Sequence, residues 1–130
     1  MKMNNVRLNE FGGIILDASI EVHRVMGPGL LEIPYELALM TELSGRGLNV
    51  KRQYAIDLTY KGIDLEKAFF IDLLVEDEIL IEVKSVAEMR PIFDAQLMTY
   101  LKSTDCKLGM LLNFNVSLIK NGIKRVVHGL

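Results

Sequence analysis

The hydrophobic pattern of this chain changes once, between Gly45 and Leu48, and that change limits the folds available to it. Before it, apolar residues recur every three or four positions, which is the spacing of an amphipathic helix. After it, short runs rich in Val, Ile, Tyr and Phe are separated by turn residues, which is typical of strands. The sequence therefore predicts an α/β fold in which two helices precede the first strands.

The two N-terminal helices are predicted at residues 9–26 and at about residues 30–44. The first ends at Gly27-Pro28, because a residue that precedes proline is disfavoured in a helix and glycine tolerates the turn. Pro34 looks like a helix breaker, but the first helical turn lacks intrahelical partners for its N–H groups. We therefore expect Pro34 to lie within the first turn of the second helix.

The rest of the chain predicts three strands, a third helix, a buried strand and a short closing strand. Turns at residues 60–62 and 76–78 separate the first three strands, and Pro91 suits the first turn of the helix. We expect one mixed sheet flanked by helices, with strands at residues 50–60, 67–75, 79–85, 107–114 and 122–128 and the third helix at residues 91–103.

Length and composition indicate one domain that covers residues 1–130 and has enough apolar material for a core. A formal net charge of −2 argues against a protein that coats nucleic acid by bulk charge, so any such contact must be local. The single cysteine, Cys106, cannot form an internal disulfide. With no signal peptide or membrane-spanning stretch in the sequence, we expect a cytoplasmic protein without membrane contact.

Asp72 is the anomalous residue of the chain, because it interrupts the apolar run of residues 69–75. An ionised carboxylate without a partner in apolar surroundings costs roughly several kcal/mol. Glu82 and Lys84 end the next apolar run and, two residues apart, share one face of a strand. They form either a solvated local pair or, with Asp72, a site where two carboxylates converge on a divalent cation.

The length of the loop between these strands decides whether the two carboxylates share a face. A loop of three residues, 76–78, places Asp72 opposite Glu82 in an antiparallel pair. A loop of two residues pairs Ile71 with Glu82 and puts the carboxylates on opposite faces, unless a bulge intervenes. We predict the three-residue loop.

Three motifs resemble those of known nucleases. Asp72 followed by Glu82-Val83-Lys84 resembles the signature of the PD-(D/E)xK nuclease superfamily. Residues 29–35, preceded by residues 22–24, are similar to the naming motif of the GxxExxY protein family, a branch of that superfamily. Residues 96–100 resemble the Q-x-x-x-Y helix of RecB-like nucleases. The resemblance implies a restriction-endonuclease-like core and spans about residues 12–114.

The resemblance also implies an activity and its cofactor. Asp72 and Glu82, with the backbone carbonyl of Val83, would bind Mg²⁺ or Mn²⁺. Lys84 would lie beside the attacking water or the scissile phosphate, although a salt bridge to Glu82 is its structural alternative. The chain is thereby expected to be a metal-dependent nuclease that hydrolyses phosphodiester bonds of DNA, ahead of RNA.

Further site residues follow from the same resemblance, each with an alternative. Glu32 and Glu36 are four residues apart on a helix, and the motif centres on Glu32, yet both also suit a surface at a helix start. Gln96 and Tyr100 are expected to face the site, or to form a helix edge with Tyr100 in the core. His23 fits helix packing or capping better than metal binding.

Two alternatives to an active nuclease also fit the sequence. The chain could be a catalytically silent nuclease-fold module that acts through a protein partner or dimerises through residues 9–26. It could also be an unrelated α/β scaffold, which an odd register between Asp72 and Glu82 would favour. Several basic residues are either local phosphate contacts or scattered solvated charge: Lys51, Arg52, Arg90, Lys120, Lys124 and Arg125.

Overall fold

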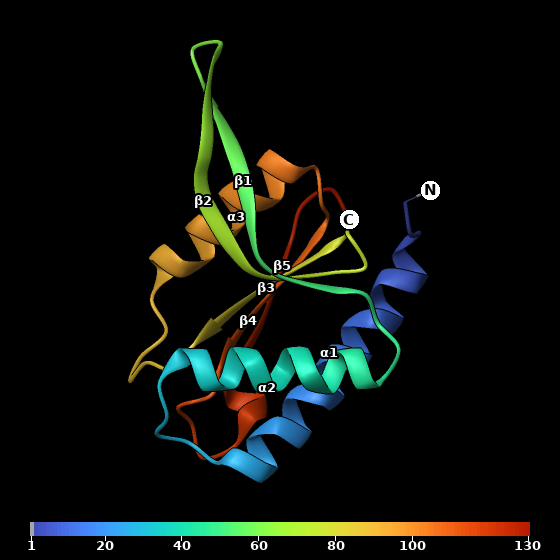
Figure 1. Ribbon diagram of the computed structural model, residues 1–130, viewed down its shortest axis with the longest axis vertical. Coiled ribbons are helices and arrows are strands. Elements are labelled where there is room, and N and C mark those ends of the chain that lie inside the picture. Colours follow the sequence, from blue (N-terminus) through green and yellow to red (C-terminus); the bar gives the residue numbers. More distant parts are fainter. Residues whose placement is uncertain (1) are drawn as a thin grey trace.

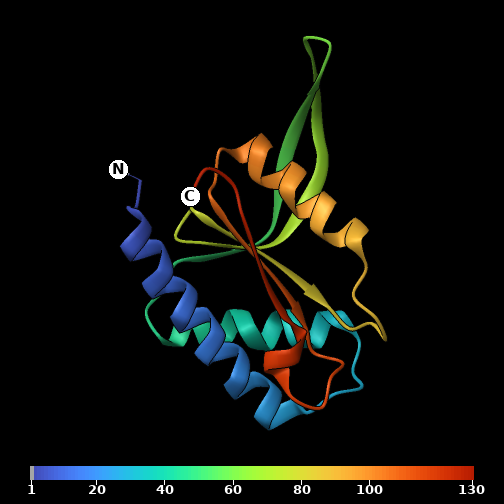
Figure 2. The same ribbon diagram turned by 180° about the vertical axis from the view of Figure 1, so that it is seen from behind.

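Five strands form one sheet with helices on both faces (Figures 1 and 2). The computed structural model describes residues 2–130. No helix within these residues has the length and apolar character that spanning a bilayer requires. The elements are α1 (Asn5–Met26), α2 (Glu32–Gly45), β1 (Val50–Tyr60), β2 (Ile63–Val75), β3 (Ile79–Lys84), α3 (Pro91–Thr104), β4 (Leu108–Asn113), the 3₁₀ helix η1 (Ile119–Gly122) and β5 (Ile123–Val127).

The sheet is mixed and has the strand order β1-β2-β3-β4-β5. β3 and β4 are parallel and are joined through α3, whereas the other neighbouring strands are antiparallel. Side chains alternate along β3: Ile79 and Ile81 pack against α1 and α2, and Leu80 packs in the core below α3. This arrangement confirms the predicted fold class.

The boundaries of the two N-terminal helices differ slightly from the prediction. α1 begins at Asn5, four residues early, because the Asn4 side chain caps it by accepting a hydrogen bond from the Arg7 N–H at 2.9 Å. α2 begins at Glu32, and Pro34 lies in its first turn as predicted.

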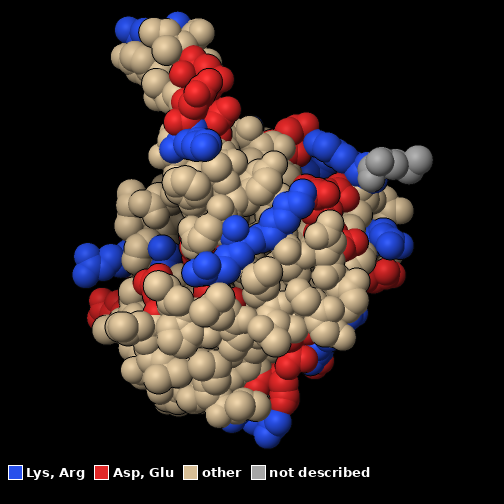
Figure 3. All heavy atoms as spheres, viewed as in Figure 1, with Lys and Arg blue, Asp and Glu red and all other residues tan. Residues whose placement is uncertain are grey.

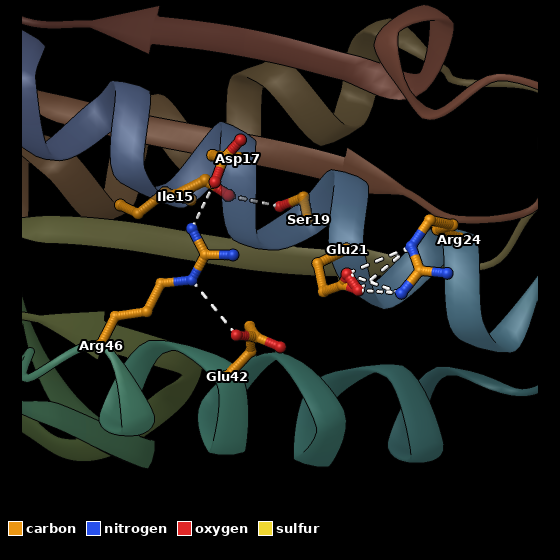
Figure 4. Close-up of polar contacts among 7 residues, drawn as sticks. All are labelled: Ile15, Asp17, Ser19, Glu21, Arg24, Glu42 and Arg46. Carbon is orange, nitrogen blue, oxygen red and sulfur yellow. Dashed lines mark hydrogen bonds and ion pairs between the residues drawn. The ribbon is translucent and has the colours of Figure 1, made fainter.

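Arg46, just beyond α2, joins the two N-terminal helices (Figure 4). Its guanidinium is 2.5 Å from the Asp17 carboxylate of α1 and 3.2 Å from the Glu42 carboxylate of α2. These contacts join the C-terminal end of α2 to α1.

The β1–β2 hairpin extends far beyond the sheet as a two-stranded arm (Figure 1). β2 begins at Ile63, four residues before its predicted start, and a β-bulge lies between Ile56 and Leu58 of β1. The apolar side chains near the tip are solvent-exposed, so this part of β2 lacks the buried apolar pattern from which strands are recognised.

The register between β2 and β3 confirms the prediction. β2 ends at Val75 and β3 begins at Ile79, so three residues form the loop. Leu73 pairs with Ile81 and Val75 pairs with Ile79, which makes Asp72 and Glu82 the next positions along the same register. The odd register that would have favoured an unrelated scaffold is therefore absent from this hairpin.

Candidate active site

The two strand carboxylates lie where β2 and β3 separate. Backbone pairing between these strands ends at Leu73 and Ile81, one residue before the carboxylates. The Asp72 side chain instead reaches across to β3, where its Oδ2 accepts a hydrogen bond of 2.8 Å from the Val83 N–H. This bond fixes Asp72 beside the Glu82-Val83 segment.

Glu82 is buried without a hydrogen-bond partner for one of its oxygens. The residue is 9% exposed, and its Oε1 contacts no donor within residues 2–130. Burial, and then the negative charge of Asp72, raises the pKa of the Glu82 carboxyl from 4.5 to about 9, against a smaller opposing effect of Lys84. In the absence of a cation the group is therefore protonated at neutral pH.

The donor atoms at this site fit a hard divalent cation. Carboxylate and carbonyl oxygens are the ligands that Mg²⁺ and Mn²⁺ prefer, and a bound cation would satisfy the unpartnered Glu82 oxygen. Across the described part of the chain, no three His, Cys, Asp or Glu side chains form a ready metal-binding group. The side-chain donors are thus two carboxylates, and the remaining ligands would come from the Val83 carbonyl, water and substrate.

Glu36 of α2 is the helical carboxylate that joins this site. Its side chain is 4% exposed, and its two oxygens accept hydrogen bonds from Arg52 Nε at 2.8 Å and from Gln53 Nε2 at 2.6 Å. Burial, followed by the charge of Asp72, raises its pKa. Glu32, which the motif had placed first, is exposed and makes none of these bonds.

A pocket of about 160 Å³ lies between α2 and the strand residues Asp72 and Val83. It is lined by Glu32, Ile33, Glu36, Gln53, Asp72 and Val83. A larger open groove, of about 610 Å³, lies between the arm and α3, but Asp57 is the only carboxylate in its lining. The smaller pocket adjoins the candidate active site, because three carboxylates line it: Glu32, Glu36 and Asp72.

Lys84 lies on the same strand as Glu82, and its ammonium group is held by an aromatic ring. The Nζ atom is 4.5 Å from the centre of the Phe93 ring of α3, a cation–π contact. Lys84 forms no ion pair with any residue that the structure describes, so the salt bridge to Glu82 that was its alternative is not formed. The charge is therefore available to an incoming anion.

The two α3 residues of the RecB-like motif differ in their surroundings. Tyr100 stacks on Phe69 with the ring centres 3.9 Å apart, which is the core packing considered as its alternative. It also lies within electrostatic reach of the site, because burial and then the charges of Glu82 and Asp72 raise its pKa. Gln96 is exposed and makes no side-chain hydrogen bond within residues 2–130.

His23 packs between elements, in agreement with the interpretation preferred from the sequence. It is buried in α1, and its Nε2 lies 2.7 Å from the Val116 carbonyl. Its ring also tilts against Phe114 at a centre distance of 6.5 Å. His23 therefore holds α1 to the segment after β4.

Most of the basic residues singled out in the sequence are engaged by neighbouring polar groups. Lys51 binds Asp77, Arg52 binds Glu36, Lys124 binds Asp94 and Arg125 donates to Asn9. Lys and Arg atoms cross the middle of the face shown in Figure 3, with Asp and Glu atoms beside them, and a group of acidic atoms lies along the arm. This face therefore lacks the continuous basic surface of a protein that coats nucleic acid.

Two residues of the site were missed in the sequence, Gln53 and Asn113. Gln53 donates to Asp72 as well as to Glu36. Asn113, buried at the end of β4, exchanges hydrogen bonds of 3.1 and 3.0 Å with the backbone of Val86 and so fixes the segment that follows Lys84. Neither belongs to a motif, and only the folded chain brings them to the site.

Comparison with known proteins gives one match. The sequence profile of the PD-(D/E)XK nuclease superfamily matches residues 9–126, which is nearly the whole chain and includes every residue of the candidate site. No curated protein and no solved structure matches the chain significantly.

Proposed function

Because the chain belongs to the PD-(D/E)XK nuclease superfamily, we propose that it hydrolyses phosphodiester bonds of DNA, ahead of RNA, with Mg²⁺ or Mn²⁺. The observation that carries the proposal is the buried Glu82 carboxyl beside Asp72, one oxygen of which has no partner among residues 2–130. A purely structural role does not explain a buried carboxyl placed beside a second carboxylate, since the charge of Asp72 raises the free energy of ionising Glu82. A divalent cation bound by both groups would offset this cost.

The division of roles follows from the positions of the donor atoms. Asp72, Glu82 and the carbonyl of Val83 would hold the ion, which when bound polarises the phosphate and lowers the pKa of a water molecule. The hydrogen bond from the Val83 N–H orients Asp72 for this task. Lys84 has no anionic partner among the described residues, so we assign it to the attacking water or to the charge that develops on the phosphate.

The outer residues of the pocket would orient water and substrate. Glu36 is anchored by Arg52 and Gln53 and faces the pocket together with Glu32, so both remain candidates for binding water near the ion. Tyr100 and the exposed Gln96 would contact the nucleic-acid backbone from α3. These roles extend the site from the strands to both helix layers.

Membership of the GxxExxY branch is part of the proposal, and the loop before α2 supports it. Gly29 has a φ of 96°, a conformation that favours glycine. The Tyr35 hydroxyl accepts a hydrogen bond of 3.1 Å from the Leu30 N–H and donates to the Gly27 carbonyl. The glycine and the tyrosine of the motif thus shape the turn that sets Glu32 at the start of α2.

The test is cleavage of linear, circular and single-stranded DNA by the wild type and by Lys84→Ala, with Mg²⁺, Mn²⁺ or EDTA. We expect metal-dependent cleavage that falls at least about 100-fold in Lys84→Ala, since electrostatic groups at a reacting phosphate contribute this much. Lys61→Ala is the matched control, because Lys61 also lies over an aromatic ring, 5.5 Å from the centre of Tyr60, but at the tip of the arm.

The outcomes separate the alternatives. Equal cleavage by Lys84→Ala and the wild type would assign the activity to a contaminant or another site. A wild type that binds DNA and the metal ion but does not cut it would favour the catalytically silent module.

A further inference from the structure

Gln53 adopts an unusual backbone conformation in the middle of β1. Its φ is 52°, in the left-handed region that residues other than glycine rarely adopt within a strand. β1 pairs with β2 on either side of it, Arg52 with Leu73 and Tyr54 with Ile71, but Gln53 and Asp72 do not pair. Strained backbone of this kind persists only where the surrounding structure stabilises it, and it gathers at functional sites.

The side chain of Gln53 bridges two acidic groups from different layers of the fold. Its Nε2 donates to Glu36 Oε1 of α2 at 2.6 Å and to Asp72 Oδ1 of β2 at 3.2 Å. A side-chain amide carries two N–H donors on one nitrogen, so one can serve each carboxylate. It also carries no net charge, so it draws the carboxylates together without competing with a cation.

We propose that Gln53 is the positioning residue that orients Asp72 for metal binding and links it to Glu36. The two hydrogen bonds supply the geometry of this assignment. The role in metal binding rests on the metal-dependent function proposed above. Asp72 is then held on both oxygens, Oδ1 by Gln53 and Oδ2 by the Val83 N–H, which leaves its remaining lone pairs pointing in fixed directions. The left-handed backbone at Gln53 is what brings the amide to this position.

The bridge itself is tested in metal-free protein by NMR. The chain's other glutamine, Gln96, is exposed and supplies an internal reference. We expect the side-chain amide protons of Gln53 to exchange with solvent at least about fivefold more slowly than those of Gln96, because hydrogen-bonded N–H groups are protected. Equal exchange of the two amides would overturn the bridge.

The role of the Gln53 bridge in metal binding is tested by Mn²⁺ titration calorimetry on Gln53→Gly and Gln53→Met. Glycine accepts the left-handed backbone but removes the amide, whereas methionine keeps the length of the side chain and loses the donors. We expect both to bind Mn²⁺ about tenfold more weakly than the wild type, as for other residues that orient metal ligands. In DNA cleavage, kcat should fall while KM changes little.

The matched control is Lys67→Gly. Lys67 has a φ of 49° and is exposed on the arm, so this variant relieves the same backbone strain away from the site. It should leave Mn²⁺ affinity unchanged. If Gln53→Gly binds Mn²⁺ as tightly as the wild type does, the positioning role is overturned while the nuclease proposal stands. If the wild-type protein neither binds Mn²⁺ nor cuts DNA, both proposals are overturned, even when the Gln53 amide is protected from exchange.

Discussion

At the scale of single residues, the informative feature is an ionisable group whose surroundings oppose its charge. Asp72 was recognisable in the sequence because a carboxylate within an apolar run requires a partner, and Glu82 followed from strand periodicity. Gln53 was not recognisable, because its role depends on a left-handed backbone and on a helix that is distant in sequence. Sequence periodicity indicates which face of a strand or helix a residue occupies. It does not indicate which polar groups of other elements contact that residue.

The choice between Glu32 and Glu36 shows the same limit. Both lie on one face of α2 in the sequence pattern, four residues apart. Their different burial arises from Arg52 and Gln53 of β1, which bind only the second of them. The identity of the anchored carboxylate is therefore a tertiary property.

Stability of the metal-free protein should depend on pH through Glu82. Its pKa rises from 4.5 to about 9 on folding, so its stabilising contribution is complete below pH 4.5 and is lost as the pH rises toward 9. Glu82→Gln removes this loss. In chemical denaturation with EDTA at pH 8, we expect the variant to be more stable than the wild type by on the order of 5 kcal/mol, with the difference disappearing near pH 4.

Glu88→Gln, a substitution of an exposed glutamate, is the control for that comparison. It should follow the wild type at every pH. A constant difference between Glu82→Gln and the wild type across the pH range would show that the Glu82 carboxyl does not change its protonation on folding.

At the scale of elements, the loop between β2 and β3 determines the site more than any other connection. Its three residues set the register that brings Asp72 and Glu82 to one place, and this could be deduced from loop length and the two-residue period. The extension of β2 to Ile63 could not, because the arm is exposed and its strands lack a buried apolar face. Sequence pattern thus identifies the strands that form the core better than strands that leave it.

The contact between η1 and β4 supports the end of the strand that faces Lys84, and a glycine allows it. A Cβ atom on Gly122 would lie 2.1 Å from the Asn113 carbonyl oxygen, so Gly122→Ala must displace backbone. We expect a loss of about 2 to 3 kcal/mol in the free energy of unfolding, as for other overpacked sites. Urea denaturation measures it.

Gly13→Ala is the matched substitution in α1. A Cβ atom there meets nothing within 4 Å, and the residue is exposed in the helix. It should stabilise the protein by about 0.5 to 1 kcal/mol, because alanine restricts the unfolded chain and favours the helix. Equal effects of the two substitutions would contradict the close approach of η1 to β4.

At the scale of the whole molecule, the bound ion should contribute to stability, because the unfolded chain has no preformed site. Mn²⁺ at about 100 times its dissociation constant should stabilise the wild type by roughly 2.7 kcal/mol. For a chain of 130 residues this corresponds to a rise in Tm of about 10 °C. Differential scanning calorimetry with Mn²⁺ and with EDTA measures the difference.

Glu82→Gln provides the reference for that experiment, because it keeps the shape of the side chain and removes the charge that attracts a cation. Its Tm should be nearly the same with Mn²⁺ and with EDTA. A rise as large as that of the wild type would place the stabilising ion elsewhere on the molecule.

The three-residue loop between β2 and β3 also bears on the order in which the chain folds. Closing so short a loop loses little chain entropy, whereas the parallel pairing of β3 with β4 must wait for residues 85–107 to cross the sheet. We therefore expect the β2–β3 hairpin to form before β4 and α2 are in place. In that early intermediate, water still solvates both Asp72 and Glu82 and weakens the repulsion between their charges. The repulsion becomes strong only when the later elements enclose the two carboxylates.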